Sequence, residues 1–96
     1  GVITPTGALS SFPYLPEESM RAARYFYELK EPAIWDKYGF YDGYSEHENW
    51  TKPWYLAIDQ GPIPVMIENL RTGLLWNLFM SCPEVQAGLE KLGFTY

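Results

Sequence analysis

Cysteine and histidine are almost absent from this chain, which has one of each, Cys82 and His47. A single cysteine allows no internal disulfide and no cysteine-based metal site. A single histidine excludes a histidine-rich zinc site within the chain. We therefore expect no metal site. We expect His47, which lies in an acidic loop, to be exposed, and Cys82 to be a small packed residue rather than a nucleophile.

Basic residues are also few, with seven Lys and Arg against twelve Asp and Glu. Nucleic-acid binding needs clustered basic side chains that neutralise phosphates, so nucleic acid is excluded as a partner. The longest apolar stretch, residues 63–80, is interrupted by Glu68, Asn69, Arg71 and Asn77. It falls short of the roughly 18 uncharged apolar residues that a membrane span requires, and we expect no membrane span.

Aromatic residues, in contrast, are abundant, at 18% of the chain. Such a content serves either a dense core or a surface that stacks on flat ligands such as sugar rings. Many of these side chains lie between residues 39 and 56, a turn-rich segment with few aliphatic residues. The Asp42-Gly43 pair suits a type I′ turn and predicts a short hairpin there. The alternative is an extended loop whose aromatic residues line a cleft.

Four shorter helical segments are predicted around this aromatic region. Pro16, followed by two glutamates, predicts the start of an amphipathic helix that ends before Pro32. Its core face is expected to carry four residues: Met20, Ala23, Phe26 and Tyr27. Residues 8–12 are expected to form one helical turn, and residues 32–39 a short helical segment that Gly39 ends. A last helix over residues 83–92 is expected to begin with a capping box of Ser81 and Glu84 and to end at Gly93.

The most apolar helix is predicted over residues 63–80, with Gly61 near its N-cap and Pro62 and Pro64 in its first turn. Its apolar residues occupy far more than one stripe, which predicts burial on opposite sides. A chain of 96 residues is too short to cover such a helix all round. A double-layered α-barrel would cover it. We therefore expect the chain, which opens at Gly1 without an initiator methionine, to be a piece of a longer protein.

Three long stretches carry a specific resemblance: PTGALSSFPYLPEESM, YGFYDGYSEHENW and YLAIDQGPIPVMIENLRTGLLWNLFMSCPEVQAGLEKLGF. They resemble the C-terminal end of a bacterial family of glucoamylase-like glycoside hydrolases that includes the endo-β-1,2-glucanases. The resemblance implies a mainly α fold, in which residues 1–96 form the C-terminal part of an (α/α)6 barrel, without a complete second domain. The segment 63–80 would be an inner helix of that barrel.

The resemblance also implies a function. It implies the inverting hydrolysis of glucans, β-1,2-glucan above all, without a metal or an organic cofactor. The expected partners are a glucan oligosaccharide or polysaccharide and the N-terminal part of the barrel. The family suggests a periplasmic or extracellular location.

Inverting hydrolysis needs one carboxylic acid that protonates the leaving oxygen and one carboxylate that activates water. Asp59 is the candidate catalytic carboxylate, because it lies at a predicted helix N-terminus, where the ionised form is favoured. The alternative is that Asp59 only caps the helix. Gln60 is a candidate for binding a sugar hydroxyl. The other catalytic carboxylate is expected outside this chain.

The remaining candidates for substrate binding come from the aromatic segment. Asp42 is a second carboxylate of interest, although a turn residue before a glycine needs no functional explanation. Tyr41, Trp54 and Tyr55 are candidates for stacking on glucose rings, and core packing is the alternative for each. Tyr14 is a weaker candidate of the same kind. Glu68 and Arg71, three apart on a helix, are expected to form a structural ion pair rather than a catalytic site.

Three functions therefore remain open. The chain is part of a hydrolase that would be inactive in isolation, or it is a non-catalytic carbohydrate-binding or structural module. It is otherwise an autonomous helical domain that buries its apolar helix by self-association. In each case the exposed apolar face of residues 63–80 predicts that the isolated chain associates.

Overall fold

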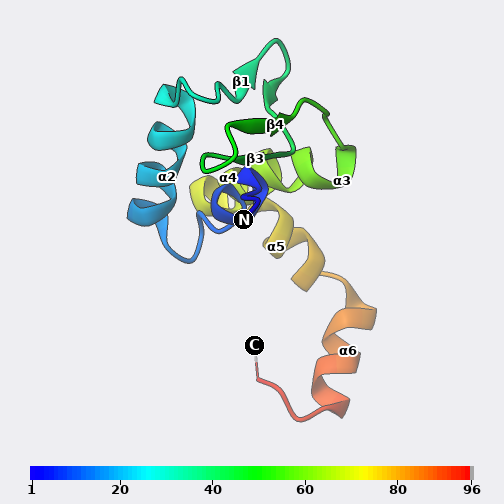
Figure 1. Ribbon diagram of the computed structural model, residues 1–96. Coiled ribbons are helices and arrows are strands. Elements are labelled where there is room, and N and C mark those ends of the chain that lie inside the picture. The colour runs from blue at the N-terminus through cyan, green and yellow to red at the C-terminus, as the bar shows by residue number, and fades with distance from the viewer. Residues whose placement is uncertain (96) are drawn as a thin grey trace.

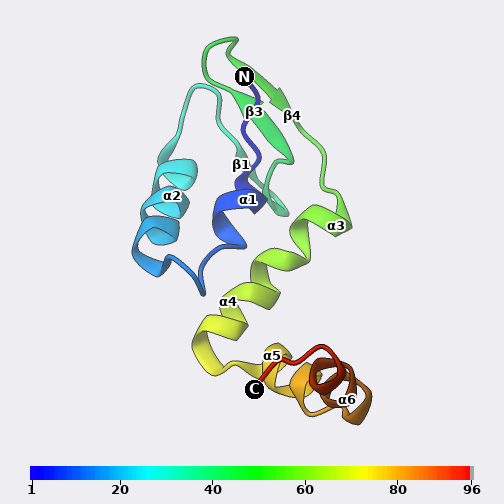
Figure 2. The same cartoon turned by 90° about the horizontal axis from the view of Figure 1, so that it is seen from below.

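The computed structural model describes residues 1–95 of the chain, which form a mainly helical fold with two short β-hairpins (Figure 1). The helices are α1 (Pro5–Leu9), α2 (Pro16–Glu28), α3 (Ala57–Gln60), α4 (Pro62–Thr72), α5 (Leu74–Met80) and α6 (Pro83–Lys91). The strands are β1 (Trp35–Asp36), β2 (Gly39–Phe40), β3 (Gly43–Ser45) and β4 (Trp50–Lys52). In both views α5 and α6 extend away from the remaining elements as an arm (Figures 1 and 2).

One small core joins α1, α2 and the hairpins. Its buried hydrophobic residues are Leu9, Phe12, Phe26, Ile34, Phe40 and Tyr44. The ring of Phe26 contacts the rings of Phe40 and Tyr44 edge-on, with centroids 6.0 and 5.9 Å apart. This geometry places the positive edge of one ring on the negative face of the next and adds to the gain from burial.

Helix α2 begins at Pro16, as predicted, and ends at Glu28. Its predicted core face is partly wrong. Phe26 is buried and Ala23 packs against the core, but the side chains of Met20 and Tyr27 are exposed. Tyr27 instead contacts the ring of Trp35. The helix is rotated so that Ser19, a small residue, lies against the core and allows close approach.

The helical segment predicted over residues 32–39 is wrong, because residues 35–40 form a β-hairpin. Strands β1 and β2 pair antiparallel, with Trp35 opposite Phe40 and ring centroids 4.7 Å apart. Ile34 is fully buried, and its carbonyl accepts a hydrogen bond from the backbone N–H of Tyr41 at 2.8 Å. Gly39 has a φ of 106°, which a helix does not accommodate. Cross-strand aromatic packing and core burial therefore override the local helical pattern.

The second hairpin has its turn at a different place from the one predicted. Asp42 lies just before β3, and Gly43 is the first residue of that strand. The turn that connects β3 to β4 is formed by residues 46–49, where Asn49 has a φ of 45°. Gly43 is buried, and a Cβ there would lie 3.1 Å from the side chain of Val2. The N-terminal segment pairs with β3 next to Gly43, through an antiparallel bridge between Ile3 and Tyr44. Glycine therefore serves close packing here, not a turn.

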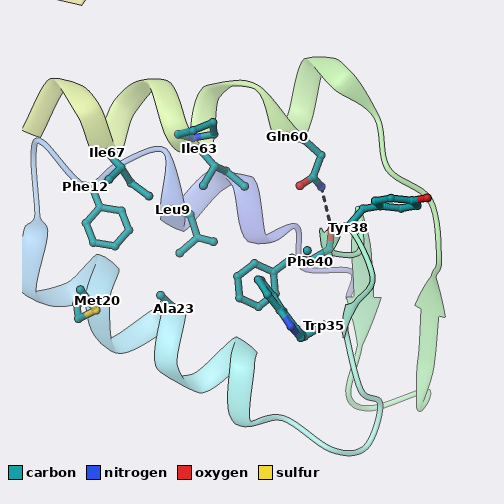
Figure 3. Close-up of a pocket in the computed structure, with 12 residues that line it drawn as sticks. Leu9, Phe12, Met20, Ala23, Trp35, Tyr38, Phe40, Gln60, Ile63 and Ile67 are labelled. Carbon is teal, nitrogen blue, oxygen red and sulfur yellow. Dashed lines mark hydrogen bonds between the residues drawn. The ribbon is translucent and has the colours of Figure 1, made fainter. Parts of the chain in front are cut away.

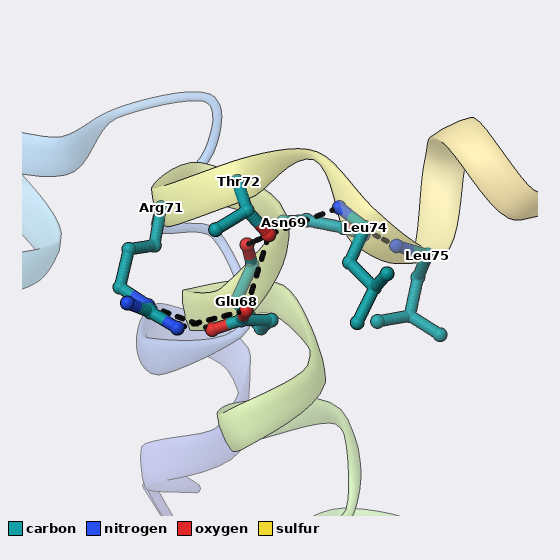
Figure 4. Close-up of polar contacts among 6 residues, drawn as sticks. All are labelled: Glu68, Asn69, Arg71, Thr72, Leu74 and Leu75. Atoms are coloured by element: carbon teal, nitrogen blue, oxygen red, sulfur yellow. Dashed lines mark hydrogen bonds and ion pairs between the residues drawn. The ribbon is translucent and has the colours of Figure 1, made fainter.

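The long helix predicted over residues 63–80 is interrupted at Gly73, whose φ of 71° is left-handed. Its start is as predicted, with Gly61 at the N-cap and Pro62 as the first residue of α4. Asn69 is the buried residue of α4, and its Oδ1 accepts the backbone N–H of Leu75 at the start of α5 (Figure 4). It also accepts the backbone N–H of Trp76. The interruption at Gly73 is therefore stabilised by specific hydrogen bonds to the Asn69 side chain.

The predicted ion pair between Glu68 and Arg71 is confirmed. Arg71 donates two hydrogen bonds to the Glu68 carboxylate, at 2.9 and 3.0 Å, and Thr72 donates a third (Figure 4). The Arg71 side chain is largely exposed, so the pair lies on the surface and not in a buried site. This arrangement contributes little to stability and leaves Glu68 fully engaged.

The arm begins differently from the prediction and ends as predicted. Ser81 is the C-cap of α5, where its hydroxyl donates to the carbonyl of Leu78, and the N-cap of α6 is Cys82 without a side-chain cap hydrogen bond. The predicted capping box is therefore wrong. Glu84 instead accepts a hydrogen bond from the Cys82 thiol. Gly93, with a φ of 79°, follows the end of α6.

The apolar surface of α4 and α5 is not covered by this chain. Within residues 1–95, α5 and α6 contain no buried residue. Large apolar side chains along α4 and α5 are exposed: Val65, Ile67, Leu70, Leu74, Trp76, Leu78 and Phe79. The expected burial on opposite sides is therefore not met within this chain. Across the described residues, no helix is long and apolar enough to cross a membrane.

Candidate active site

Two segments far apart in the sequence meet at the candidate site. The backbone N–H of Asp42 donates to the carbonyl of Trp54 at 3.0 Å. The side-chain amide of Gln60 donates to the carbonyl of Phe40 at 2.9 Å (Figure 3). These hydrogen bonds hold the segment that leads into α3 against the connection between β2 and β3. They bring the side chains of the two candidate carboxylates, Asp42 and Asp59, together.

The carboxyl groups of Asp42 and Asp59 lie within hydrogen-bond reach of each other. This contact raises the pKa of Asp42, burial raises it further, and the positive charge of Lys52 acts in the opposite direction. Oδ1 of Asp42 is buried, and none of the N–H or O–H groups of residues 1–95 donates to it. The protonated form of Asp42 is therefore favoured relative to an ordinary carboxyl group.

Asp59 lies in the first turn of α3 and is half-buried. The alternative that it only caps a helix is wrong. Leu56 is the N-cap of α3 and Gly61 is the N-cap of α4, and neither helix has a side-chain cap hydrogen bond at its start. The position of Asp59 beside a second carboxylate therefore lacks the simplest structural explanation.

Three tyrosines, Tyr38, Tyr41 and Tyr55, form a cluster. The ring of Tyr55 contacts the ring of Tyr38 edge-on, at a centroid distance of 5.5 Å, and that of Tyr41 at 5.7 Å. The hydroxyl of Tyr41 donates to Oδ2 of Asp36 at 2.7 Å, which holds the pKa of Asp36 below its usual value. The hydroxyl of Tyr55 is buried and has no hydrogen-bond partner in the described part of the chain.

Sequence reasoning missed Tyr38 and Asp36. Both belong to the β1–β2 hairpin, which the sequence pattern assigned to a helix, and they reach the cluster only because that segment folds back. The glycine that follows Tyr38 was the available signal, since a glycine after two loop residues is typical of a tight hairpin.

The other predicted site residues lie around or away from this cluster. Trp54 is 56% exposed, and the Lys52 ammonium lies 4.3 Å from its ring centroid. His47 is exposed, as predicted. Tyr14 is exposed and contacts Trp76 near the arm, so the structure does not bring it to the cluster.

A cavity of about 520 Å³ lies between α1, α2, the first hairpin and α4 (Figure 3). Its lining includes Leu9, Phe12, Met20, Trp35, Ile63 and Ile67. Gln60 contributes an amide at its edge, but that amide nitrogen already bonds to Phe40. Sugar hydroxyls need several convergent polar groups, so this apolar cavity is unsuited to a glucan. Within residues 1–95 there is also no cluster of three acidic, histidine or cysteine side chains that would hold a metal ion.

Known proteins match this chain along most of its length. The sequence model of the glycoamylase family, described as "Putative glucoamylase", matches residues 1–83. The exo-β-1,2-glucooligosaccharide sophorohydrolase (non-reducing end) of Parabacteroides distasonis is 50% identical over 92 residues, which cover 96% of this chain and 13% of that enzyme.

Solved structures match its fold closely. A Bacteroides uniformis protein described as "a putative glucoamylase" superposes with a TM-score of 0.93 at 65% identity, over 99% of this chain and 23% of that chain. The endo-β-1,2-glucanase of Chitinophaga pinensis, in complex with sophorotriose and glucose, superposes with a TM-score of 0.89 at 65% identity. That match covers 96% of this chain and 22% of the enzyme. The chain thus spans less than a quarter of these relatives, and it belongs to the glycoamylase family.

Proposed function

We propose that this chain contributes part of the carbohydrate site of a glycoside hydrolase that cleaves β-1,2-linked glucans with inversion. The observation that carries the proposal is the contact between the Asp42 and Asp59 carboxyl groups. The names of two relatives support the substrate, since both act on β-1,2-linked glucose chains.

The chain would occupy the C-terminal part of an (α/α)6 barrel, with α4 among the inner helices. The apolar side chains that α4 and α5 expose, and the apolar cavity beside α4, suit surfaces that other helices of such a barrel would cover. Covering them removes apolar area from water, which is the main driving force for association. The N-terminal part of the barrel is therefore the expected partner.

The closeness of the two carboxylates supports different roles for them. In inverting enzymes the acid and the base stand about 6.5–9.5 Å apart to leave room for water. Asp42 and Asp59, within hydrogen-bond reach, are too close to be that pair and would act as one unit. Asp59 would serve as the base that takes a proton from the attacking water. A carboxylic acid from another segment of the barrel would protonate the leaving oxygen, so the isolated chain would be inactive.

The neighbouring side chains would bind the sugar. The tyrosine rings offer apolar faces for the C–H groups of glucose. The hydroxyl of Tyr55 has unused hydrogen-bonding capacity for a sugar hydroxyl or water. The exposed ring of Trp54 would stack on a glucose unit at the outer end of the site. The side-chain N–H of Gln60 holds α3 in place, and its side-chain oxygen would accept a hydrogen bond from a sugar hydroxyl. No metal or organic cofactor is part of this proposal.

A chimera tests this function. The matching segment of the Chitinophaga pinensis enzyme is replaced by this chain, which is 65% identical to it. We expect hydrolysis of linear β-1,2-glucan but not of starch, and a product that NMR detects first as the α-anomer. Asp59→Asn should lower kcat by about 100-fold or more, the usual size of a general-base effect.

The control is Glu17→Gln, the same chemical change at an exposed position of α2, which should keep full activity. Starch cleavage without β-1,2-glucan cleavage would contradict the substrate. A β-anomeric first product would contradict inversion, and an active Asp59→Asn chimera would contradict the role of Asp59.

A second candidate function is a non-catalytic helical module that self-associates. The exposed apolar face of α4 and α5 favours it. A chimera without activity on any glucan, together with stable dimers of the isolated chain, would support this candidate over the enzyme.

A further inference from the structure

We propose that Asp42 and Asp59 share a single proton, which Asp42 holds and donates to Asp59. Asp42 is then a positioning residue: it fixes the Asp59 carboxylate and leaves one oxygen of Asp59 free for water. This inference rests on the proposed function, because it assigns a partner to the proposed base.

The backbone holds Asp42 against the segment that leads into α3. Its N–H donates to the carbonyl of Trp54 at 3.0 Å, and its side chain reaches the carboxyl group of Asp59. Two ionised carboxylates in contact repel each other, so such a pair retains one proton between them. The geometry of the backbone therefore imposes proton sharing on the pair.

The buried oxygen of Asp42 indicates which residue holds the proton. Oδ1 of Asp42 is buried without any donor in the described part of the chain. An ionised oxygen in that position would lose its hydration and gain no hydrogen bond, which is costly. A protonated Asp42 removes the charge from this position and supplies the one donor that the pair otherwise lacks.

The charged and titratable groups around Asp42 are few. Asp59 faces it from α3 and Lys52 from β4, while Tyr41, its neighbour in the chain, is already bonded to Asp36. Lys52 would favour an ionised Asp42, but its ammonium lies over the ring of Trp54. The positive charge of Lys52 is thus held by another contact, and Asp59 has the larger effect on Asp42.

The consequence for the reaction is simple. The ionised Asp59 accepts a proton from the water that attacks the sugar, and that proton returns to solvent after the product leaves. The proton of Asp42 is not consumed. Activity should fall when Asp42 loses its proton, because Asp59 then loses its donor and gains a like charge beside it.

Two variants of the chimera test this arrangement. Asparagine at position 42 still donates an N–H but does not titrate, whereas alanine does neither. We expect kcat of Asp42→Asn to exceed that of Asp42→Ala by about tenfold or more, the usual size for a hydrogen bond to a charged group. The kcat profile of Asp42→Asn should also extend to higher pH than that of the parent chimera.

Equal kcat values for the two variants, or an unchanged basic limb for Asp42→Asn, would overturn the inference. The thermal midpoint of each variant identifies an alanine variant that fails to fold, and the pH profile of Asp42→Asn then decides alone. Asp59→Asn distinguishes a failure of the proposed function from a failure of the proton sharing. If that variant is active, the proposed function fails. If it is inactive while the Asp42 variants behave alike, only the proton sharing fails.

Discussion

The side-chain oxygen of Asn69 accepts the backbone N–H of Leu75 at 3.0 Å, across the interruption between α4 and α5 (Figure 4). It also accepts the next N–H of the chain, from Trp76. Gly73, the N-cap of α5, has no side chain that could do this. Asn69 therefore caps α5 from the preceding helix and fixes how the arm leaves the core.

Loss of this cap should destabilise the chain. Asn69→Ala leaves two N–H groups without their acceptor and should lower the free energy of unfolding by about 1–3 kcal/mol. Urea denaturation followed by circular dichroism measures the change. The control, Asn77→Ala, removes an exposed side chain of α5 and should change stability by less than about 0.5 kcal/mol. Equal effects of the two variants would contradict the cap.

Gly73 should tolerate alanine poorly. Its φ of 71° is left-handed, and a Cβ there would lie 3.1 Å from the side-chain nitrogen of Asn77. Gly73→Ala should therefore cost about 1–2 kcal/mol in the same unfolding experiment. Gly88→Ala is the matched control, because that position lies inside α6 with open space around it. It should stabilise by up to about 1 kcal/mol, and a comparable loss at both positions would refute the backbone argument.

The hydrogen bond from Tyr41 to Asp36 should be visible in a pH titration. It lowers the pKa of Asp36 from its ordinary 3.8. A group with a lowered folded-state pKa stabilises the fold fully above its unfolded value, and this contribution is lost as pH falls through the folded value. Tyr41→Phe should raise the pKa of Asp36 toward 3.8. Carbon-13 NMR of the carboxyl group measures it.

Tyr38→Phe is the control for this titration. It removes a hydroxyl from the same cluster of rings without touching Asp36. An Asp36 pKa that responds equally to both variants would show that the ring cluster, and not the hydrogen bond, sets it.

The isolated chain should associate through the arm and α4. Leu78 and Phe79 are about 60% exposed. Replacing both with glutamate should weaken association by at least tenfold, since burial of one large apolar side chain contributes about 1.5–3 kcal/mol. Sedimentation equilibrium over a range of concentrations measures it. Asn77→Glu adds charge at a neighbouring polar position and should have a smaller effect. An unchanged mass with the double variant would place the association elsewhere.

Local chemistry made several features predictable. Pro16 and Pro62 lack a backbone donor and have φ preset for a helix, so both helix starts were found in the sequence. Gly93 after α6 and the ion pair of Glu68 with Arg71 follow from spacing alone. The family was also visible in the sequence, because long specific stretches carry it.

Other features depended on contacts that no local pattern contains. Residues 35–40 form a hairpin because the core buries Ile34 and Phe40. The helix predicted over residues 63–80 is interrupted because Asn69 caps α5 across Gly73. In both cases a tertiary contact outweighs helix propensity, which amounts to less than about 1 kcal/mol per residue.

The sequence by itself determined the starts of α2 and α4, the family and the identity of the candidate carboxylates as Asp42 and Asp59. Only the tertiary structure decided that these two carboxyl groups meet. The physical reason is the hydrogen bond between the backbone of Asp42 and that of Trp54, which closes a loop between segments distant in the chain. Every residue except proline carries the same backbone donor and acceptor. The side-chain pattern therefore does not predict which of these groups pair across a fold.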